Sequence, residues 1–238
     1  MLINTDLVAN GPYTDVVVLI DVLRTCTVAP MLFDQGASSL SLTTSMRRAR
    51  AAAAGNVLVG ERQGVPPEGF NHGNSPANLA RIGFGDRDVV MVSENAPRWL
   101  EQLGGARHVL LGSLYNAGAV ARRAAALAGS RIDLVCSGFA GEPDLDDTLA
   151  AAVIAGLART HLAVSEVAGA TRLATTVLRA FPEPLDVLWR SVAGQYLRSI
   201  GLEQDIGFAA RVSASESVPQ LVGVEPGEHG NLYRFTAS

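Results

Sequence analysis

The chain of 238 residues has two cysteines, no lysine and only 5% aromatic residues. The two cysteines, Cys26 and Cys136, are too few for a disulfide scaffold, and their spacing matches no metal site. The net charge is −4 and no long run of basic residues is present, so the electrostatic pattern of a nucleic-acid-binding protein is missing. The missing lysine looks compositional, and we draw no function from it.

Targeting segments and long apolar runs are also missing. Residues 1–6 lack the basic start and the apolar stretch of a signal peptide. No apolar run approaches the roughly 20 residues that a membrane-spanning helix requires. We therefore expect a reduced, cytoplasmic setting with no membrane partner.

The pattern that is present alternates short apolar runs with helical stretches. This alternation predicts an α/β fold, with three α/β/α layers and a mainly parallel sheet. No linker interrupts it, so we expect one domain over residues 1–238. The expected strands are 16–20, 38–42, 57–59, 88–92, 108–111 and 132–136. The expected helices are 25–34, 45–54, 96–103, 116–127 and 147–162.

Two further expectations concern the arrangement of these elements. Residues 16–62 and 108–141 look loosely alike, which predicts a weak internal repeat. Residues 209–238 are expected to form an irregular tail with one or two short strands. A homodimer is the expected assembly only because two-fold dimers are the commonest oligomers.

The most informative stretch is the junction after residues 16–20, which are five consecutive apolar residues. Such a run predicts a strand covered on both faces, and ligands of α/β sheets bind beyond the carboxyl ends of such strands. Asp21 and Arg24 stand at this point. An arginine fork binds phosphate, and a nearby carboxylate would repel that anion unless Mg²⁺ lay between them. The structural alternative is that Asp21 caps the next helix and Arg24 lies in solvent.

A second polar cluster follows residues 57–59. Glu61 and Arg62 repeat the pairing of an acid with an arginine, although a solvated ion pair explains them equally well. Asn74 and Ser75 lie further along the same loop, where an ordinary turn is the alternative. A loop as long as 60–78 inside a compact fold is usually functional.

Two more junctions carry polar residues. Ser113 and Asn116 follow residues 108–111, and they either cap the next helix or help to bind an oxyanion. Asp144, Asp146 and Asp147 precede a long helix, where acidic residues complement the helix dipole in any protein. One of these aspartates is also a candidate metal ligand.

Two known classes of phosphatase fit poorly. A cysteine phosphatase has an arginine six residues after its cysteine, whereas Leu32 and Glu142 occupy those positions here. The haloacid dehalogenase class has a second aspartate two residues after its nucleophile, whereas the residue two positions after Asp21 is Leu23. An aspartyl-phosphate mechanism at Asp21 is kept as an alternative.

Taken in order, the motifs resemble those of the Mg²⁺-dependent 2-phosphosulfolactate phosphatases. The main matches are Asp-Val-Leu-Arg at 21–24, Gly-Glu-Arg at 60–62, Gly-Phe at 69–70, Gly-Asn-Ser-Pro at 73–76 and Gly-Ser-x-x-Asn at 112–116. Weaker matches are the Gly-rich turn and acidic pair at 138–147, Gly-Leu at 201–202, Asp-Ile at 205–206 and Val-Pro at 218–219. The resemblance covers nearly the whole chain.

The resemblance implies hydrolysis of 2-phospho-3-sulfolactate to 3-sulfolactate and phosphate, on the coenzyme M route, with Mg²⁺ as cofactor. We predict Asp21, Arg24 and Glu61 as catalytic residues, and Asp21, Glu61 and Asp147 as metal ligands. Whether water or Asp21 attacks the phosphorus is left open. The predicted substrate-binding residues are Arg62, Asn74, Ser75, Asn95, Ser113 and Asn116.

The chain departs from this family at two places. The family usually has Thr-Thr-Asn-Gly-Thr where this chain has Ser-Glu-Asn-Ala-Pro at 93–97, so Asn95 is kept and Glu94 adds a charge that opposes an anionic substrate. Cys26 stands where a hydroxyl residue is common. The alternative function is therefore a weakly active relative that binds a small anionic metabolite.

Overall fold

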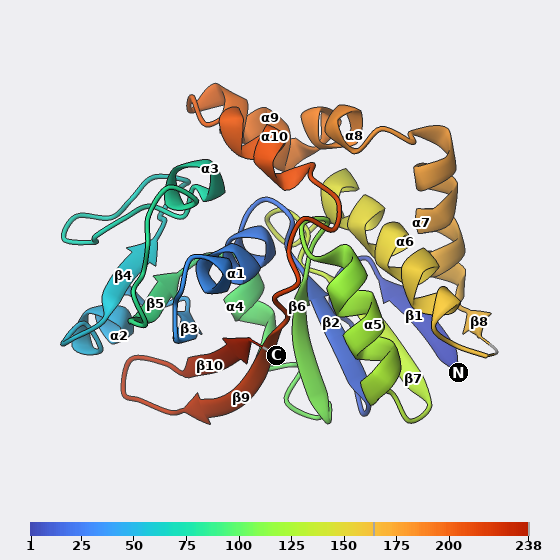
Figure 1. The fold of residues 1–238 in the computed structure, drawn as a ribbon, viewed down its shortest axis with the longest axis horizontal. Helices are drawn as coiled ribbons and strands as arrows, with labels where there is room; N and C mark the ends of the chain where they lie inside the picture. Colours follow the sequence, from blue (N-terminus) through green and yellow to red (C-terminus); the bar gives the residue numbers. More distant parts are fainter. Residues whose placement is uncertain (164, 238) are drawn as a thin grey trace.

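The computed structural model describes residues 1–163 and 165–237. Its strands form one sheet in the order β4-β5-β3-β10-β9-β6-β2-β7-β1-β8 (Figure 1). The strands are β1 (Leu2–Asp6), β2 (Val16–Ile20), β3 (Ser39–Thr43), β4 (Val57–Gly60), β5 (Asp88–Val92), β6 (His108–Gly112), β7 (Arg131–Cys136), β8 (Glu166–Val167), β9 (Pro219–Glu225) and β10 (Leu232–Ala237). The predicted α/β class with a mainly parallel sheet is confirmed.

Helices cover both faces of this sheet (Figure 1). The helices are α1 (Thr25–Asp34), α2 (Met46–Ala51), α3 (Pro76–Leu79), α4 (Ala96–Trp99), α5 (Ala117–Leu127), α6 (Leu145–Thr160), α7 (Gly169–Ala180), α8 (Pro184–Arg190), α9 (Val192–Ser199) and α10 (Gln204–Ala209). Helices α5 and α6 pack on one face, and α1, α3 and α4 pack on the other. Helices α8, α9 and α10 lie together above the carboxyl ends of the strands (Figure 1).

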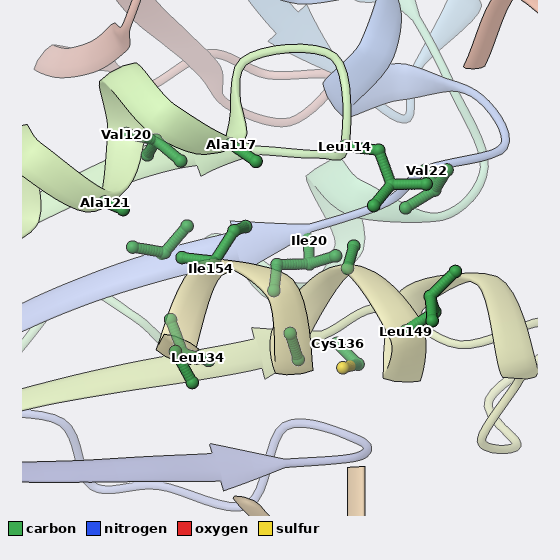
Figure 2. Packing of buried hydrophobic residues seen from close by; sticks show 14 of the residues in the cluster. Ile20, Val22, Leu114, Ala117, Val120, Ala121, Leu134, Cys136, Leu149 and Ile154 are labelled. Atoms are coloured by element: carbon green, nitrogen blue, oxygen red, sulfur yellow. The ribbon is translucent and has the colours of Figure 1, made fainter. Parts of the chain in front are cut away.

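Strand β2 shows why a fully apolar run is needed at the centre of the sheet. Val16, Val18 and Ile20 face the cluster formed with α5 and α6. Val17 and Leu19 face the opposite cluster, which contains α1. Figure 2 shows Ile20 in the first cluster, among side chains from both helices. Because alternate residues of a strand point to opposite faces, both sets are buried at once.

The C-terminal segment contains two strands, as expected, but these strands belong to the sheet rather than to an irregular tail. Strands β9 and β10 form an antiparallel hairpin in the middle of the sheet, where β10 pairs with β3 and β9 contacts β6. Most of β9 is exposed, so its sequence lacks the buried pattern of a central strand. Strand position depends on partners far away in the chain, which local patterns do not report.

Other strands and helices also differ from those expected from the sequence. Strand β1 was not expected, because its polar residues Asn4 and Thr5 hide the strand pattern; they hydrogen-bond to Asp133 and Thr171. Helices α2 and α4 are shorter than expected, and α6 begins two residues before Asp147. Its start is fixed by Asp144, whose side chain accepts a bond from the first backbone N–H of the helix.

The strand order does not display the expected repeat. Strands β2 and β3 of the first segment are separated by three strands, β10, β9 and β6, whereas β6 and β7 of the second segment flank β2. The two segments therefore occupy non-equivalent places in the sheet. Within the described residues, no helix is both long enough and apolar enough to cross a membrane.

Candidate active site

A pocket of about 430 Å³ lies at the carboxyl ends of the strands, between the loops that follow β4, β5 and β7 and the helix α9. Its lining contains both polar and apolar side chains. The lining residues are Leu23, Arg24, Glu61, Gln63, Gly64, Asn74, Ser93, Glu94, Asn95, Arg98, Phe139, Ala140, Ala193, Tyr196 and Leu197. Arg24, Glu61 and Asn74, which were all predicted as site residues, therefore line one pocket.

Asp21, the remaining predicted catalytic residue, is not among the lining residues and is 2% exposed. One carboxylate oxygen accepts a bond of 3.0 Å from the backbone N–H of Ala96, and the other accepts a bond of 3.3 Å from that of Thr25. Burial raises the pKa of Asp21 to about 6, and the negative charge of Glu61 raises it further, against the effect of these bonds. Asp21 thus joins the ends of β2 and β5.

Arg24 is held in place by two partners. Its Nη1 contacts Asp205 Oδ2 at 3.0 Å, and its Nη2 donates to the carbonyl of Gly64 at 3.0 Å. The side chains of Arg24 and Asp205 are 4% and 0% exposed. Asp205 also accepts a bond of 2.5 Å from the hydroxyl of Ser75. The guanidinium is therefore fixed at the pocket wall before any ligand binds.

Glu61 and Asn74 add to the polar side chains of the lining. The carboxylate of Glu61 accepts bonds from the backbone N–H groups of Gly64 at 2.8 Å and Glu94 at 3.0 Å. Asn74 is 3% exposed, yet its Oδ1 is buried without a hydrogen-bond partner. A buried acceptor without a partner is costly, which marks it as a site for a bound cation or donor.

Asp147 is occupied by the fold. Its carboxylate accepts bonds from the backbone N–H groups of Val22, Ser137 and Gly138 and from the hydroxyl of Ser137. Burial raises its pKa to about 7, and the charge of Asp21 adds to this effect. Among the described residues, no three His, Cys, Asp or Glu side chains gather at metal-binding spacing. The predicted set of Asp21, Glu61 and Asp147 therefore does not form a three-carboxylate site.

Both cysteines are buried thiols. Burial raises the pKa of Cys26 and of Cys136 well above the ordinary value, and the charge of Asp147 adds to this effect. A protonated thiol is a poor nucleophile, in agreement with the absence of a cysteine-phosphatase motif.

Comparisons with known proteins cover nearly the whole chain. Residues 2–223 match the profile of the family described as 2-phosphosulpholactate phosphatase. The chain is similar to a probable 2-phosphosulfolactate phosphatase of Deinococcus radiodurans, with 38% identity over 241 residues, which span 100% of both chains. The chain belongs to the 2-phosphosulfolactate phosphatase family.

Further members of this family extend the match. A probable 2-phosphosulfolactate phosphatase of Thermus thermophilus is 39% identical over 213 residues, covering 89% of this chain and 90% of that one. One from Carboxydothermus hydrogenoformans is 30% identical over 207 residues, covering 86% and 85%. Family membership places the chain among the phosphoric monoester hydrolases.

Residues 93–97 depart from the family pattern, and the charge that Glu94 adds there is paired in the structure. Glu94 pairs with Arg62 at 2.8 Å and accepts a bond from the backbone N–H of Gln63. The charge of Glu94 is therefore balanced rather than directed unopposed at a ligand. Arg62 itself lies outside the pocket lining, so the structure does not place this predicted substrate-binding residue at the site. Ser93 bonds through its hydroxyl to Thr25 at 2.7 Å.

The other predicted binding residues divide into two groups. Asn95 lines the pocket, whereas Ser75 lies behind it, bonded to Asp205. Ser113 and Asn116 lie outside the pocket and stabilise the turn between β6 and α5, where Asn116 accepts from the backbone N–H of Ser113 at 3.0 Å. The amide of Asn116 also donates to the carbonyls of residues 111 and 217. These bonds account for both side chains structurally.

Several residues of the site were not predicted from the sequence. Asp205 holds Arg24, and the Asp-Ile match at 205–206 is the signal that could have identified it. Arg98, Phe139 and Tyr196 also line the pocket; Phe139 lies in the Gly-rich turn matched at 138–147, whereas no motif contains Arg98 or Tyr196. The ring of Tyr196 packs 5.8 Å from that of Phe139, and its hydroxyl donates to the carbonyl of Gln63 at 2.9 Å.

Gly64 gives a first testable consequence. Its φ is +75°, and a Cβ there would lie 2.5 Å from Ile200 Cδ1 and 3.2 Å from Tyr196 Cε1. We expect Gly64→Ala to lower the free energy of unfolding by about 1–3 kcal/mol through backbone strain and crowding. Urea unfolding measures it, with Gly55→Ala as control, because Gly55 has φ +81° and nothing within 4 Å of a Cβ. Equal losses in both variants would contradict the crowding against α9.

The buried carboxylates predict a pH dependence of stability. Asp21 and Asp147 have pKa values of about 6 and about 7 in the folded protein, above their ordinary value of 3.8. Between pH 3.8 and about pH 7, the folded state therefore binds more protons than the unfolded chain. The free energy of unfolding consequently falls as the pH rises through this range. Urea unfolding of the metal-free protein at about pH 5 and about pH 7.5 measures the effect. A flat or rising stability over this range would exclude it.

Proposed function

We propose that the protein hydrolyses 2-phospho-3-sulfolactate, or a closely related small phosphorylated hydroxy acid, to 3-sulfolactate and phosphate. Water supplies the new oxygen on phosphorus, the ester bond to the alcohol oxygen breaks, and one water proton goes to that oxygen. The observation that carries the proposal is that Arg24, Glu61 and Asn74 line one pocket in a member of this family. The names of the similar proteins specify the same substrate.

Mg²⁺ is part of the proposal, and the residues present fit it. This ion commonly binds one or two protein carboxylates and completes its shell with substrate phosphate oxygens and water. Asp21 and Glu61 supply two carboxylates close enough that the charge of one raises the pKa of the other. The unpartnered Oδ1 of Asn74 is a third oxygen at the same pocket. Bound there, Mg²⁺ would neutralise charge on the phosphoryl oxygens.

The protein's own groups bind and orient the substrate. Arg24 uses two of its N–H groups on Asp205 and Gly64, so other donors of its guanidinium are left for a phosphate. The carboxylates of Asp21 and Glu61 orient the attacking group. Each oxygen of Asp21 accepts one backbone N–H bond and so keeps a lone pair for a cation, and we propose water rather than this buried carboxylate as the attacking group.

Phosphate release from 2-phospho-3-sulfolactate and from a broad panel of phosphoesters tests the function. We expect release with Mg²⁺, at least about a hundredfold loss with a chelator, and recovery when Mg²⁺ is restored. If no phosphoester is cleaved while anions still raise the melting temperature, the protein is an anion-binding relative instead. Stable trapping of Asp21 with beryllium fluoride would support the aspartyl-phosphate route.

Asn74 allows a specific test of the metal. Replacing it with alanine removes the unpartnered oxygen, so we expect the Mg²⁺ concentration for half-maximal activity to rise by about tenfold. Asn71→Ala is the matched control, because Asn71 lies on the same loop and its Oδ1 accepts from the backbone N–H of Leu58. The same shift in both variants would show that the loop, rather than the Asn74 oxygen, sets the metal dependence.

A further inference from the structure

Two arginines line the pocket, and they differ in their partners. Arg24 is buried and paired with Asp205. Arg98 is exposed, and within the described part of the chain its side chain forms no salt bridge. Arg98 therefore has its charge and all of its N–H donors available to a ligand.

The guanidinium of Arg98 has no ionic partner among the described residues, but it has a defined position beside an aromatic ring. It lies over the ring of Trp99, 5.3 Å from the ring centroid. The indole N–H of Trp99 donates to the carbonyl of Ser137 at 3.0 Å, which anchors that ring. At the other end of α4, the N–H of Ala96 donates to Asp21. The short helix α4, which carries Arg98, is thus bonded to Asp21 at its first residue and to Ser137 through its last residue.

Apart from the two arginines, the described lining offers a second anionic group neutral donors, such as the side-chain amides of Gln63 and Asn95, and no further cation. Glu94 is paired with Arg62, and Glu61 accepts two backbone N–H bonds. The wall formed by Phe139, Ala193 and Leu197 is apolar. An acidic group of the substrate that lies away from the phosphate therefore has Arg98 as its cationic partner.

The two arginines differ in depth, and this separates their ligands. Arg24 lies among the buried Glu61 and Asn74, where the phosphate would bind with Mg²⁺. Arg98 lies at the exposed rim. In 2-phospho-3-sulfolactate the sulfonate is one carbon further from the phosphate than the carboxylate is. It is therefore the group that reaches the rim.

We infer that Arg98 binds the substrate's anionic group farthest from the phosphate, the sulfonate in 2-phospho-3-sulfolactate, and thereby determines substrate preference. This inference rests on the proposed function. The planar fork of arginine gives paired, charge-assisted hydrogen bonds to such an oxyanion. A phosphoester without that group loses these bonds, while its phosphate is still held by Arg24.

The test compares two substrates that share the phosphate and the carboxylate. 2-Phospholactate has a methyl group where 2-phospho-3-sulfolactate carries its sulfonate on the same carbon. We expect Arg98→Ala to lower kcat/KM for the sulfonated substrate by about 10- to 100-fold, mostly through KM. For 2-phospholactate the change should stay within about threefold. Arg98→Lys keeps the charge without the fork, so its loss should be intermediate.

Arg190→Ala is the matched control, because Arg190 is an exposed arginine over the ring of Phe181 and outside the pocket. Neither substrate should respond to it. If 2-phospholactate is turned over too slowly, its inhibition constant against the sulfonated substrate gives the same comparison. An equal loss on both substrates in Arg98→Ala would overturn this inference alone. A wild-type protein that cleaves neither would overturn the proposed function and this inference with it.

Discussion

Replacing Asp21 with asparagine is expected to reduce kcat/KM for phosphoester hydrolysis by about a hundredfold to a thousandfold. The substitution removes a buried negative charge next to the pocket and turns one acceptor oxygen into a donor. That new donor faces a backbone N–H group, either that of Ala96 or that of Thr25. A carboxylate proposed to bind Mg²⁺ and orient the attacking group would thus be lost. Initial rates at saturating Mg²⁺ measure the effect.

Asp15→Asn separates this effect from general damage. Asp15 precedes β2, at the opposite end from Asp21, and it is also buried. Its carboxylate likewise accepts backbone N–H bonds, from Ser130 and Arg131. We expect this variant to lose stability and to keep kcat/KM per folded molecule. Similar activity losses in the two variants would show that Asp21 serves the fold rather than the reaction.

Removing Asp205 should give the largest loss of stability in this molecule. Asp205→Ala leaves the guanidinium of Arg24 buried without its counter-charge, so we expect the free energy of unfolding to fall by about 3–5 kcal/mol. The hydroxyl of Ser75 loses its acceptor as well. Chemical denaturation measures the loss. Glu216→Ala is the control, because the pair of Glu216 with Arg122 is exposed and is expected to contribute at most about 1 kcal/mol.

A double variant distinguishes stability from function at this pair. Arg24→Met combined with Asp205→Leu removes both charges, so most of the stability should return. Activity should not return, because the arginine proposed to bind the phosphate is missing. If Asp205→Ala is no less stable than Glu216→Ala, the buried pair does not hold the site together. If the double variant is active, Arg24 is not needed for phosphate.

The sequence identified much of this site because its motifs stand where strands end. Asp21 and Glu61 directly follow β2 and β4, and ligands of α/β sheets bind beyond the carboxyl ends of strands. Asn74 was found through its place in a long loop and a family motif. These predictions needed only local order along the chain and one rule about α/β sheets.

The site residues that were missed, and the predicted residues that lie outside the pocket, both depend on contacts between distant segments. Asp205 meets Arg24 across 181 residues of chain, so no local pattern relates them. Arg62 looked like a ligand for phosphate, but Glu94 from another loop takes its charge. Ser113 and Asn116 follow a strand as expected, but their side chains form hydrogen bonds within the turn. A strand-end motif predicts that a residue is near the site, and its bonding partners decide what it does.

The central hairpin has a consequence for the order in which the protein is made. In the sheet, β4, β5 and β3 form one parallel group, β6, β2, β7, β1 and β8 form another, and β9 and β10 lie between the two groups. The hairpin is synthesised after every other strand. Glu61 follows a strand of one group and Asp21 follows a strand of the other. The sheet that carries both carboxylates is therefore continuous only when this hairpin, the last of the described strands to be synthesised, is in place.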